Sequence, residues 1–240
     1  MTGRLMIMVP VRGRKANCER LLKSYADTVE SADMVFVLDP DDLATYEGVD
    51  WGRTRQVVLD PRGMIGPKRN YAARMFADEY DALMCAEDDI TFGATRGWDT
   101  ILMGELEAMG GSGMVYPDED RRTDIPENVL ISTDIVKALG WFCEPSMQHY
   151  WIDNVWADLG RGAGCLKLCT DVKWENFHYT MGKAGNTARD ETYSTAERLG
   201  PADALAYRVW RDERMAQDVA TVMGVLGKQA GFRLIHSGAK

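Results

Sequence analysis

Short apolar runs alternate with longer amphipathic segments over the first 90 residues, and this alternation constrains the fold most strongly. The apolar runs are Leu5–Val9, Met34–Leu38, Gln56–Leu59 and Ala82–Ala86. Between them, Asn17–Val29 and Pro67–Tyr80 place apolar side chains at helical spacing. Strands that alternate with helices are typical of a parallel, doubly wound sheet. We therefore predict an α/β fold with a mostly parallel central sheet and flanking helices.

The second half of the chain carries a less regular pattern. Apolar runs at Met114–Tyr116 and Val129–Ser132 predict that the sheet becomes mixed there. The segment Pro201–Leu226 spaces its apolar side chains for packing as one long C-terminal helix. No low-complexity linker divides the 240 residues, of which 45% are hydrophobic, so we expect a single domain, 1–240, with one large core.

Composition excludes several classes of protein. The five cysteines are odd in number and form no Cys-x-x-Cys pair, which argues against a zinc knuckle or a disulfide framework and favours a reducing cytoplasm. No hydrophobic run approaches a membrane span, and Met1–Arg4 is too short for a leader, so we expect no membrane partner. The net charge of −9 argues against a general nucleic-acid binder. Positive charge nevertheless gathers in 12–15, 53–74 and 183–189, which is compatible with a local basic groove.

Three adjacent acids, Glu87, Asp88 and Asp89, follow the apolar run Ala82–Ala86. Open α/β sheets bind ligands beyond the carboxyl ends of their strands, which is where these side chains would emerge. Neighbouring carboxylates repel one another, and hard oxygen ligands at an i, i+2 spacing suit Mg²⁺ or Mn²⁺, with Glu87 and Asp89 on one side of the strand. The triplet predicts a metal site, with a solvated acidic turn as the alternative.

Two basic loops accompany the acid triplet. Gly66 and Pro67 begin a helix as cap and first residue, which places Lys68 and Arg69 in its first turn. Cations are unfavourable at that end of the helix dipole unless an anion is present, and a phosphate would supply one. The loop Pro10–Lys15 likewise follows the first strand and leads into a helix capped by Asn17. Together the loops and the triplet predict a site for a metal-bound diphosphate, with solvated basic turns as the alternative.

In this order along the chain, the residues resemble a known family. The segment Val9–Arg14, a strand ending in Asp39, the helix start at Gly66 and the acid triplet look like the nucleotide-sugar half of a GT-A fold glycosyltransferase. The triplet corresponds to the DxD motif of that fold in a Glu-Asp-Asp form. Further along, Leu139–Glu144, Trp151–Asn154 and Leu159-Gly160 are similar to the acceptor half of inverting family 2 glycosyltransferases.

The resemblance spans about residues 5 to 180. It implies a nucleotide-sugar half over about 1–112, an acceptor half over about 113–180, and a mobile loop with a C-terminal helix over 181–240. It implies that Asp89 binds the metal and that Glu87 belongs to the metal site, where it reaches the ribose or a metal-bound water. Asp39 would accept hydrogen bonds from uracil or ribose. The other donor-binding residues that it implies are Pro10, Arg12, Arg14, Lys68, Arg69 and Asp88.

The resemblance also implies a general base for the acceptor hydroxyl. Asp153 matches the second member of the acidic pair in the family's pattern, whereas the first member is Ile152 here. Glu144 and Asp158 therefore remain competitors. From the residues alone, the tryptophans around Asp153 would raise the pKa of its carboxyl toward neutrality. The alternative is a surface acid on an amphipathic helix.

The last candidates lie after residue 170. Alternation in Val172–His178 predicts a strand that places His178 on the face of Val172 and Trp174, and imidazole is a competent ligand for Mn²⁺. A histidine that is merely hydrogen bonded is the alternative. The glycine-punctuated segment Met181–Asp190 predicts a mobile lid whose Lys183 or Arg189 closes onto the diphosphate, or else a plain linker.

We therefore expect a metal-dependent glycosyltransferase that uses Mn²⁺ or Mg²⁺ to move a hexose from a UDP-sugar to an acceptor hydroxyl, with inversion. Small soluble enzymes of this type resemble those carried by bacteriophages, which would act in the host cytoplasm. We rank a hydroxymethylated pyrimidine in DNA first as acceptor and a virion protein or a small molecule second. The rivals are a sugar-phosphate nucleotidyltransferase, whose first loop resembles Val11–Lys15, and a non-catalytic nucleotide-sugar-binding protein.

Overall fold

A seven-stranded sheet forms the centre of the computed structural model, which describes residues 3–227. The strands are β1 Leu5–Pro10, β2 Asp33–Leu38, β3 Arg55–Val58, β4 Ala82–Cys85, β6 Met114–Asp118, β7 Leu130–Ser132 and β8 Leu166–Lys173. Their order across the sheet is β3-β2-β1-β4-β7-β6-β8. The strand β7 runs antiparallel to β4 and β6, whereas the other pairings are parallel. The predicted mostly parallel sheet, with its mixed region near β6 and β7, is confirmed.

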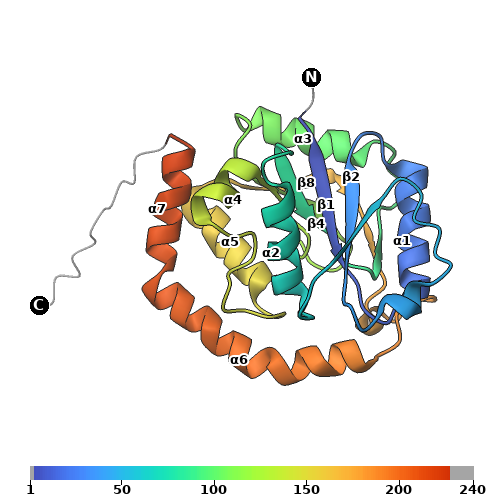
Figure 1. The fold of residues 1–240 in the computed structure, drawn as a ribbon. Helices are drawn as coiled ribbons and strands as arrows, with labels where there is room; N and C mark the ends of the chain where they lie inside the picture. The colour runs from blue at the N-terminus through green and yellow to red at the C-terminus, as the bar shows by residue number, and fades with distance from the viewer. Residues whose placement is uncertain (1–2, 228–240) are drawn as a thin grey trace, which may run out of the picture.

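Helices cover both faces of this sheet (Figure 1). They are α1 Lys15–Thr28, α2 Ile65–Phe76, α3 Trp98–Ala108, α4 Thr133–Leu139, α5 Ile152–Ala163, α6 Glu191–Glu213 and α7 Met215–Val225. In β1, Leu5, Ile7 and Val9 pack in a core with α1 and α3, whereas Met6 and Met8 pack in a second core with α2, α4, α5 and α7. Burial on both faces explains why the strands are continuously apolar.

The predicted helix caps are wrong by two to three residues. The helix α1 begins at Lys15, so that Asn17 lies in its first turn, where its amide donates to the hydroxyl of Thr187 at 2.9 Å. The helix α2 begins at Ile65, which places Gly66 inside the first turn. A Cβ on Gly66 would lie 2.7 Å from the carbonyl oxygen of Met147, so a close backbone approach explains this glycine.

The predicted strand Val172–His178 is interrupted. The strand β8 ends at Lys173, and the chain then pairs as β9, Glu175–Asn176, with the short strand β5, Ile90–Thr91. Trp174 lies between the two strands and packs edge-on against Trp98 and Phe92 in the core. His178 follows β9 and precedes the 3-10 turn η2, Tyr179–Met181. A further 3-10 turn, η1 at Leu43–Tyr46, follows β2.

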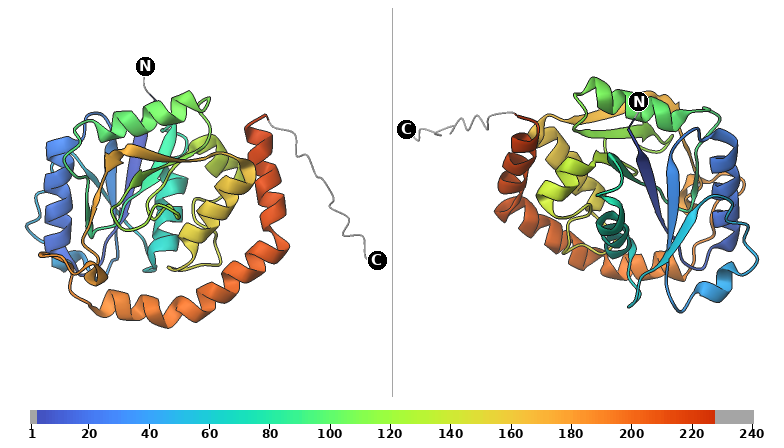
Figure 2. Two further views of the ribbon diagram at one scale, coloured as in Figure 1. Left: turned by 180° about the vertical axis from the view of Figure 1, so that it is seen from behind. Right: turned by 45° about the horizontal axis from the view of Figure 1, so that its top comes forward.

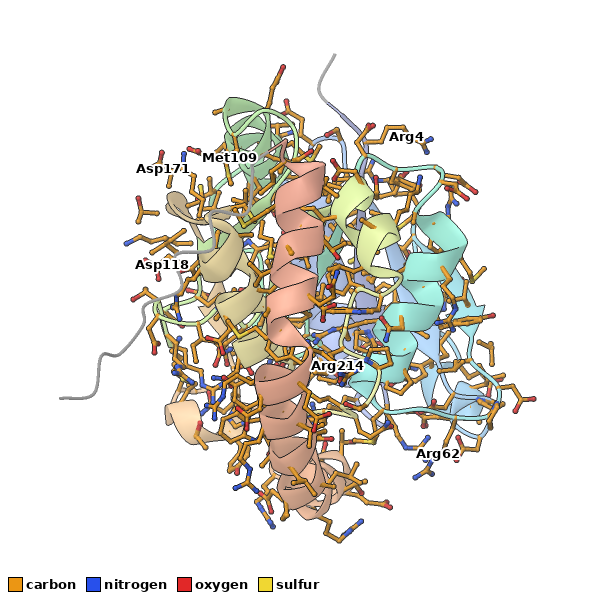
Figure 3. All side chains as sticks on the ribbon, turned by 90° about the vertical axis from the view of Figure 1, so that its left-hand side faces the viewer. Arg4, Arg62, Met109, Asp118, Asp171 and Arg214 are labelled. Atoms are coloured by element: carbon orange, nitrogen blue, oxygen red, sulfur yellow. The ribbon has the colours of Figure 1, made fainter. Side chains whose placement is uncertain are left out.

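The predicted single helix Pro201–Leu226 is two helices that meet at Arg214 (Figure 3). The helix α6 starts ten residues earlier than predicted and contains Pro201. Arg214 forms an ion pair with Glu144 at 2.7 Å, and the indole of Trp210 donates to Asp218 at 2.8 Å across the junction. Of the predicted segment 181–240, residues 228–240 lie outside the described residues.

The helix α6 crosses the end of the molecule at which the parallel strands finish (Figure 1). It remains at the border of the molecule in both views of Figure 2 and then turns into α7, which packs on α4 and α5. None of the helices within residues 3–227 is long and apolar enough to cross a membrane.

Candidate functional site

A cleft of about 570 Å³ opens where β1 and β4 end. It is bounded by the loops after these strands, the start of α2, the segment 121–127, the start of α5 and the segment 178–193. The predicted site residues that line it are Pro10, Arg12, Arg14, Lys68, Arg69, Glu87, Asp88, Asp89, Asp153 and His178. The structure thus brings together residues that are separated by up to 168 positions in the sequence. Asp39, Lys183 and Arg189 do not line it.

The acid triplet forms part of the floor of the cleft. Asp88 and Asp89 are buried, whereas the side chain of Glu87 is 37% exposed. Burial raises the pKa of both aspartates, and the charge of Glu87 raises the pKa of Asp89 further. Oδ1 of Asp89 is buried and has no hydrogen-bond partner. The alternative of a solvated acidic turn is therefore contradicted. A cation at Oδ1 would satisfy this atom and favour the ionised form of the carboxylate.

Arg14 links the loop Pro10–Lys15 to the acid triplet and to α6. Its Nη1 donates to Asp88 at 3.0 Å, while Nε and Nη2 donate to the two carboxylate oxygens of Asp190 at 2.7 and 3.0 Å. The guanidinium also lies over the ring of Tyr193, 4.1 Å from its centroid. Arg14 therefore has two carboxylate partners from the chain itself, and its position in the site depends on the start of α6.

The cations at the start of α2 are buried and paired. Lys68 donates to Oδ2 of Asp39 at 2.8 Å and to the carbonyl of Val11 at 2.7 Å. Arg69 donates to Glu87 at 3.3 Å, and its Nε is buried without a partner. Burial lowers the pKa of Lys68, and Asp39 opposes this effect. The alternative of a solvated basic turn is thus contradicted, because both cations are buried and carboxylates of the chain pair with them at the helix start.

Asp39 directly follows β2 and is fully buried. Its carboxylate accepts from Lys68, from Arg12 at 2.9 Å and from the backbone N–H of Gly63 at 3.3 Å. Arg12 also forms a bidentate pair with Asp41 at the protein surface. Both oxygens of Asp39 therefore accept from protein donors, and its carboxylate organises the residues that line the cleft.

Asp153 occupies the first turn of α5 at the edge of the cleft. Burial raises the pKa of its carboxyl, against the opposing effects of Arg122 and of a hydrogen bond from the N–H of Asn154. Its predecessor Ile152 is buried against Gly66, which explains an apolar residue where the family pattern has an acid. Trp151, with φ at +69°, lines the cleft beside it.

The two competing acids lie elsewhere. Glu144 is 1% exposed and pairs with Ser146 and Arg214, and Asp158 accepts from the hydroxyl of Tyr207 at 2.5 Å. Neither carboxylate lines the cleft. The geometry therefore favours Asp153 among the three predicted candidates.

His178 lines the cleft, although it does not belong to a strand. Its Nδ1 lies 2.8 Å from the hydroxyl of Thr180, which leaves Nε2 as the nitrogen through which the ring would bind a metal. Burial lowers the pKa of the imidazole, and the carboxylate of Asp89 opposes the shift. Within residues 3–227, no three His, Cys, Asp or Glu side chains form a cluster ready to hold a metal. A metal at Asp89 and His178 would therefore need oxygens from a bound ligand.

The predicted lid residues have other partners. Lys183 pairs with Asp120, and Arg189 pairs with Glu197 at 2.5 Å. The lid segment is attached to the protein through Thr187, whose N–H donates to the carbonyl of Phe177 at 2.8 Å. That Lys183 or Arg189 closes onto a bound diphosphate stays a prediction. Mobility of the segment stays a prediction.

Several residues that line the cleft were not predicted from the sequence. Burial raises the pKa of Glu127 to about 7, and its Oε2 is buried without a partner. Burial, with help from Arg69, lowers the pKa of His149 to about 4, and its Nδ1 also lacks a partner. Tyr193 donates its hydroxyl to Oδ2 of Asp89 at 2.5 Å. A cap signal at Asp190 could have located the start of α6, but no local pattern marks the other residues as site residues.

No protein-family model and no curated protein matches the chain. Among solved structures, a mannosyltransferase from Pyrobaculum calidifontis in complex with GDP-Man and Mn²⁺ matches with a TM-score of 0.60 and 14% identity, over 95% of this chain and 75% of the other. Glucosyl-3-phosphoglycerate synthase from Mycobacterium tuberculosis with Mn²⁺, UDP and phosphoglyceric acid matches with a TM-score of 0.54 and 11% identity, over 95% and 80%.

The same synthase with Mn²⁺, UDP-Glc and phosphoglyceric acid gives a TM-score of 0.52 and 12% identity, over 95% and 81%. At these identities the likeness concerns the fold. The chain has the α/β GT-A fold, as the sequence predicted.

Proposed function

We propose that the protein is a metal-dependent glycosyltransferase that moves a sugar from a nucleoside diphosphate sugar to an acceptor hydroxyl. The observation that carries the proposal is the buried, unpartnered Oδ1 of Asp89 at the carboxyl end of β4. It lies in one cleft with buried cations and with Asp153. The Mn²⁺ and nucleotide or nucleotide-sugar complexes of the similar structures support the same chemistry.

The residues present fit a divalent cation. Asp89 and His178 would bind it directly, Glu87 would bind it through water or contact the ribose, and diphosphate oxygens would complete the coordination. When bound, the metal would neutralise the charge that develops on the leaving diphosphate. We propose Mn²⁺ rather than Mg²⁺, because an imidazole ligand suits Mn²⁺ better.

The remaining donor contacts would come from the two basic loops. Arg12 and Arg69 line the cleft and would lie near the pyrophosphate, while Lys68 and Asp39 hold the loops in place. The wall of the cleft against which the donor would lie includes Pro10, Arg14 and Asp88. We propose a UDP-sugar as donor, with GDP-mannose as the comparison compound, because the similar structures contain both kinds of nucleotide.

Asp153 would act as general base and remove the proton from the acceptor hydroxyl. Its burial supports the role, because a raised pKa increases the proton affinity of the carboxylate. A base on the acceptor side is what an inverting displacement requires, so we propose inversion. Glu127, which also has a raised pKa at the cleft, is the competing base.

For the acceptor we propose a hydroxymethylated pyrimidine in DNA. The protein would then be a phage enzyme that modifies DNA in the host cytoplasm. Tyr150 and Trp151, which are 37% and 38% exposed at the cleft, would stack on a base, and Arg121 and Arg122 would approach phosphates. A virion protein or a small molecule is the second candidate.

A screen of nucleotide sugars by thermal shift, with Mn²⁺ or EDTA, tests the proposal. The winning donor is then incubated with modified DNA, protein and small-molecule acceptors, and mass spectrometry identifies the product. Stabilisation by UDP and release of UDP from the donor are the expected results. Stabilisation by a nucleoside triphosphate alone would identify a nucleotidyltransferase, and binding without any turnover would identify a binding protein.

A further inference from the structure

The helix α6 begins directly beside the acid triplet. Asp190 caps its first turn by accepting a hydrogen bond from the N–H of Tyr193 at 3.1 Å. The same carboxylate binds Arg14 through two hydrogen bonds, and Arg14 binds Asp88. This chain of contacts fixes the start of α6 against the loop that carries the triplet.

Tyr193 is the residue of α6 that reaches the predicted metal ligand. It is 6% exposed, and its hydroxyl donates to Oδ2 of Asp89 at 2.5 Å. Its ring lies beneath the guanidinium of Arg14 and meets the ring of His178 edge-on, with the centroids 4.8 Å apart. Aromatic contacts on two sides therefore hold the phenol in place.

We propose that Tyr193 is a positioning residue for the metal-binding carboxylate of Asp89. The terminal torsion of an aspartate is broad, so a free carboxylate samples many orientations. A hydrogen bond to Oδ2 removes that freedom and leaves Oδ1, the atom without a partner, to bind the cation. The inference rests on the proposed function, because it assumes a metal at Asp89.

The inference gives α6 a part in metal binding. The contact between Tyr193 and Asp89 joins residues 104 positions apart in the sequence. The ion pair Arg14–Asp190 holds the start of α6 beside the acid triplet. Partners of this kind typically change metal affinity by about 10- to 100-fold when they are removed. The phenol therefore links the docking of α6 to occupancy of the metal site.

The test is the affinity for Mn²⁺, alone and with UDP, measured from the electron paramagnetic resonance signal of free Mn²⁺. Tyr193→Phe removes the hydroxyl and keeps the ring contacts, and we expect it to weaken Mn²⁺ binding about 10- to 100-fold. The matched control is Tyr179→Phe, because the ring of Tyr179 packs on Tyr193 and its hydroxyl faces Glu197 at 3.3 Å. The control should stay within about twofold of the parent.

Two further measurements separate positioning from folding. Saturating Mn²⁺ should restore the turnover of Tyr193→Phe, so that the apparent KM for Mn²⁺ rises and kcat is kept. If Tyr193→Phe fails to fold, Asp190→Asn carries the test, with a several-fold loss of Mn²⁺ affinity relative to Glu197→Gln on the same helix. The metal-free melting temperature of each variant checks the fold.

Unchanged or tighter Mn²⁺ binding by folded Tyr193→Phe, with normal binding by the parent, overturns the inference and leaves the proposed function standing. A loss of turnover that saturating Mn²⁺ does not restore also overturns it, because the phenol would then act on something other than metal binding. If the parent binds no Mn²⁺ in either condition, the inference and the metal dependence of the proposed function fail together.

Discussion

Replacing Asp203 by asparagine should weaken the hydrogen bonds that hold the segment 148–150, one wall of the cleft, against α6. Asp203 lies in α6, is 1% exposed, and accepts hydrogen bonds from the backbone N–H groups of Gln148, His149 and Tyr150, each at 2.9 Å. His149 and Tyr150 line the cleft, and Asp153 follows three residues later. A single carboxylate therefore fastens this wall to α6.

The size of the effect follows from the three bonds. A hydrogen bond to a charged acceptor contributes about 1.5 to 3 kcal/mol, so three give an upper range of about 5 to 9 kcal/mol. Asparagine keeps one carbonyl oxygen, and water reaches the partly exposed segment. We therefore expect the free energy of unfolding to fall by about 3 kcal/mol, which for a chain of this size lowers the Tm by about 6 to 12 °C.

Urea unfolding of Asp203→Asn measures the loss. The matched control is Asp212→Asn on the same helix, because Asp212 is 67% exposed and contacts Arg211 only loosely, at 3.4 Å. The control should stay within about 0.5 kcal/mol of the parent. A loss below about 1 kcal/mol for Asp203→Asn, or one equal to the control, would refute the reasoning.

Two further predictions concern the carboxylates at the cleft. Asp153→Asn should keep donor binding, measured by calorimetry, and lower the rate of sugar transfer at least about a hundredfold. The control Asp158→Asn, at a carboxylate away from the cleft, should transfer the sugar normally. Near-normal transfer by Asp153→Asn would assign the base to Glu127 instead. Because burial raises the pKa of Glu127 to about 7, the folded protein retains a proton there that the unfolded chain has lost, and stability falls as pH rises from about 4.5 to 7. In urea unfolding, the free energy of unfolding of Glu127→Gln should decrease over this pH range by about 1 to 3 kcal/mol less than that of the parent. Identical pH profiles for the two proteins would contradict the assignment.

The sheet was predictable because burial leaves a direct mark on the sequence. Strands such as β1 and β4 are covered on both faces, so they appear as uninterrupted apolar runs. The position of Asp89 followed from the same argument, since ligands bind beyond the carboxyl ends of parallel strands. The order of the basic loops and the triplet then indicated the GT-A fold.

The errors arose where distant contacts override local pattern. Alternation extended the strand to His178, but Trp174 turns into the core and the chain changes its pairing partner. Asn17 has a good capping side chain, yet it bonds Thr187, which is 170 residues away. The contact between Tyr193 and Asp89 has no local signal, because it depends on α6 returning across the end of the sheet.

Calorimetric titration of UDP into the parent and into Asp89→Ala, each with Mn²⁺ and with EDTA, tests the central claim most directly. Asp89 is a buried acid with an unpartnered oxygen in the cleft, so its removal and removal of the metal should act on the same interaction. We predict that the parent with Mn²⁺ binds UDP at least about tenfold more tightly than the other three combinations. Equal affinity in all four would contradict a metal-bound diphosphate at Asp89.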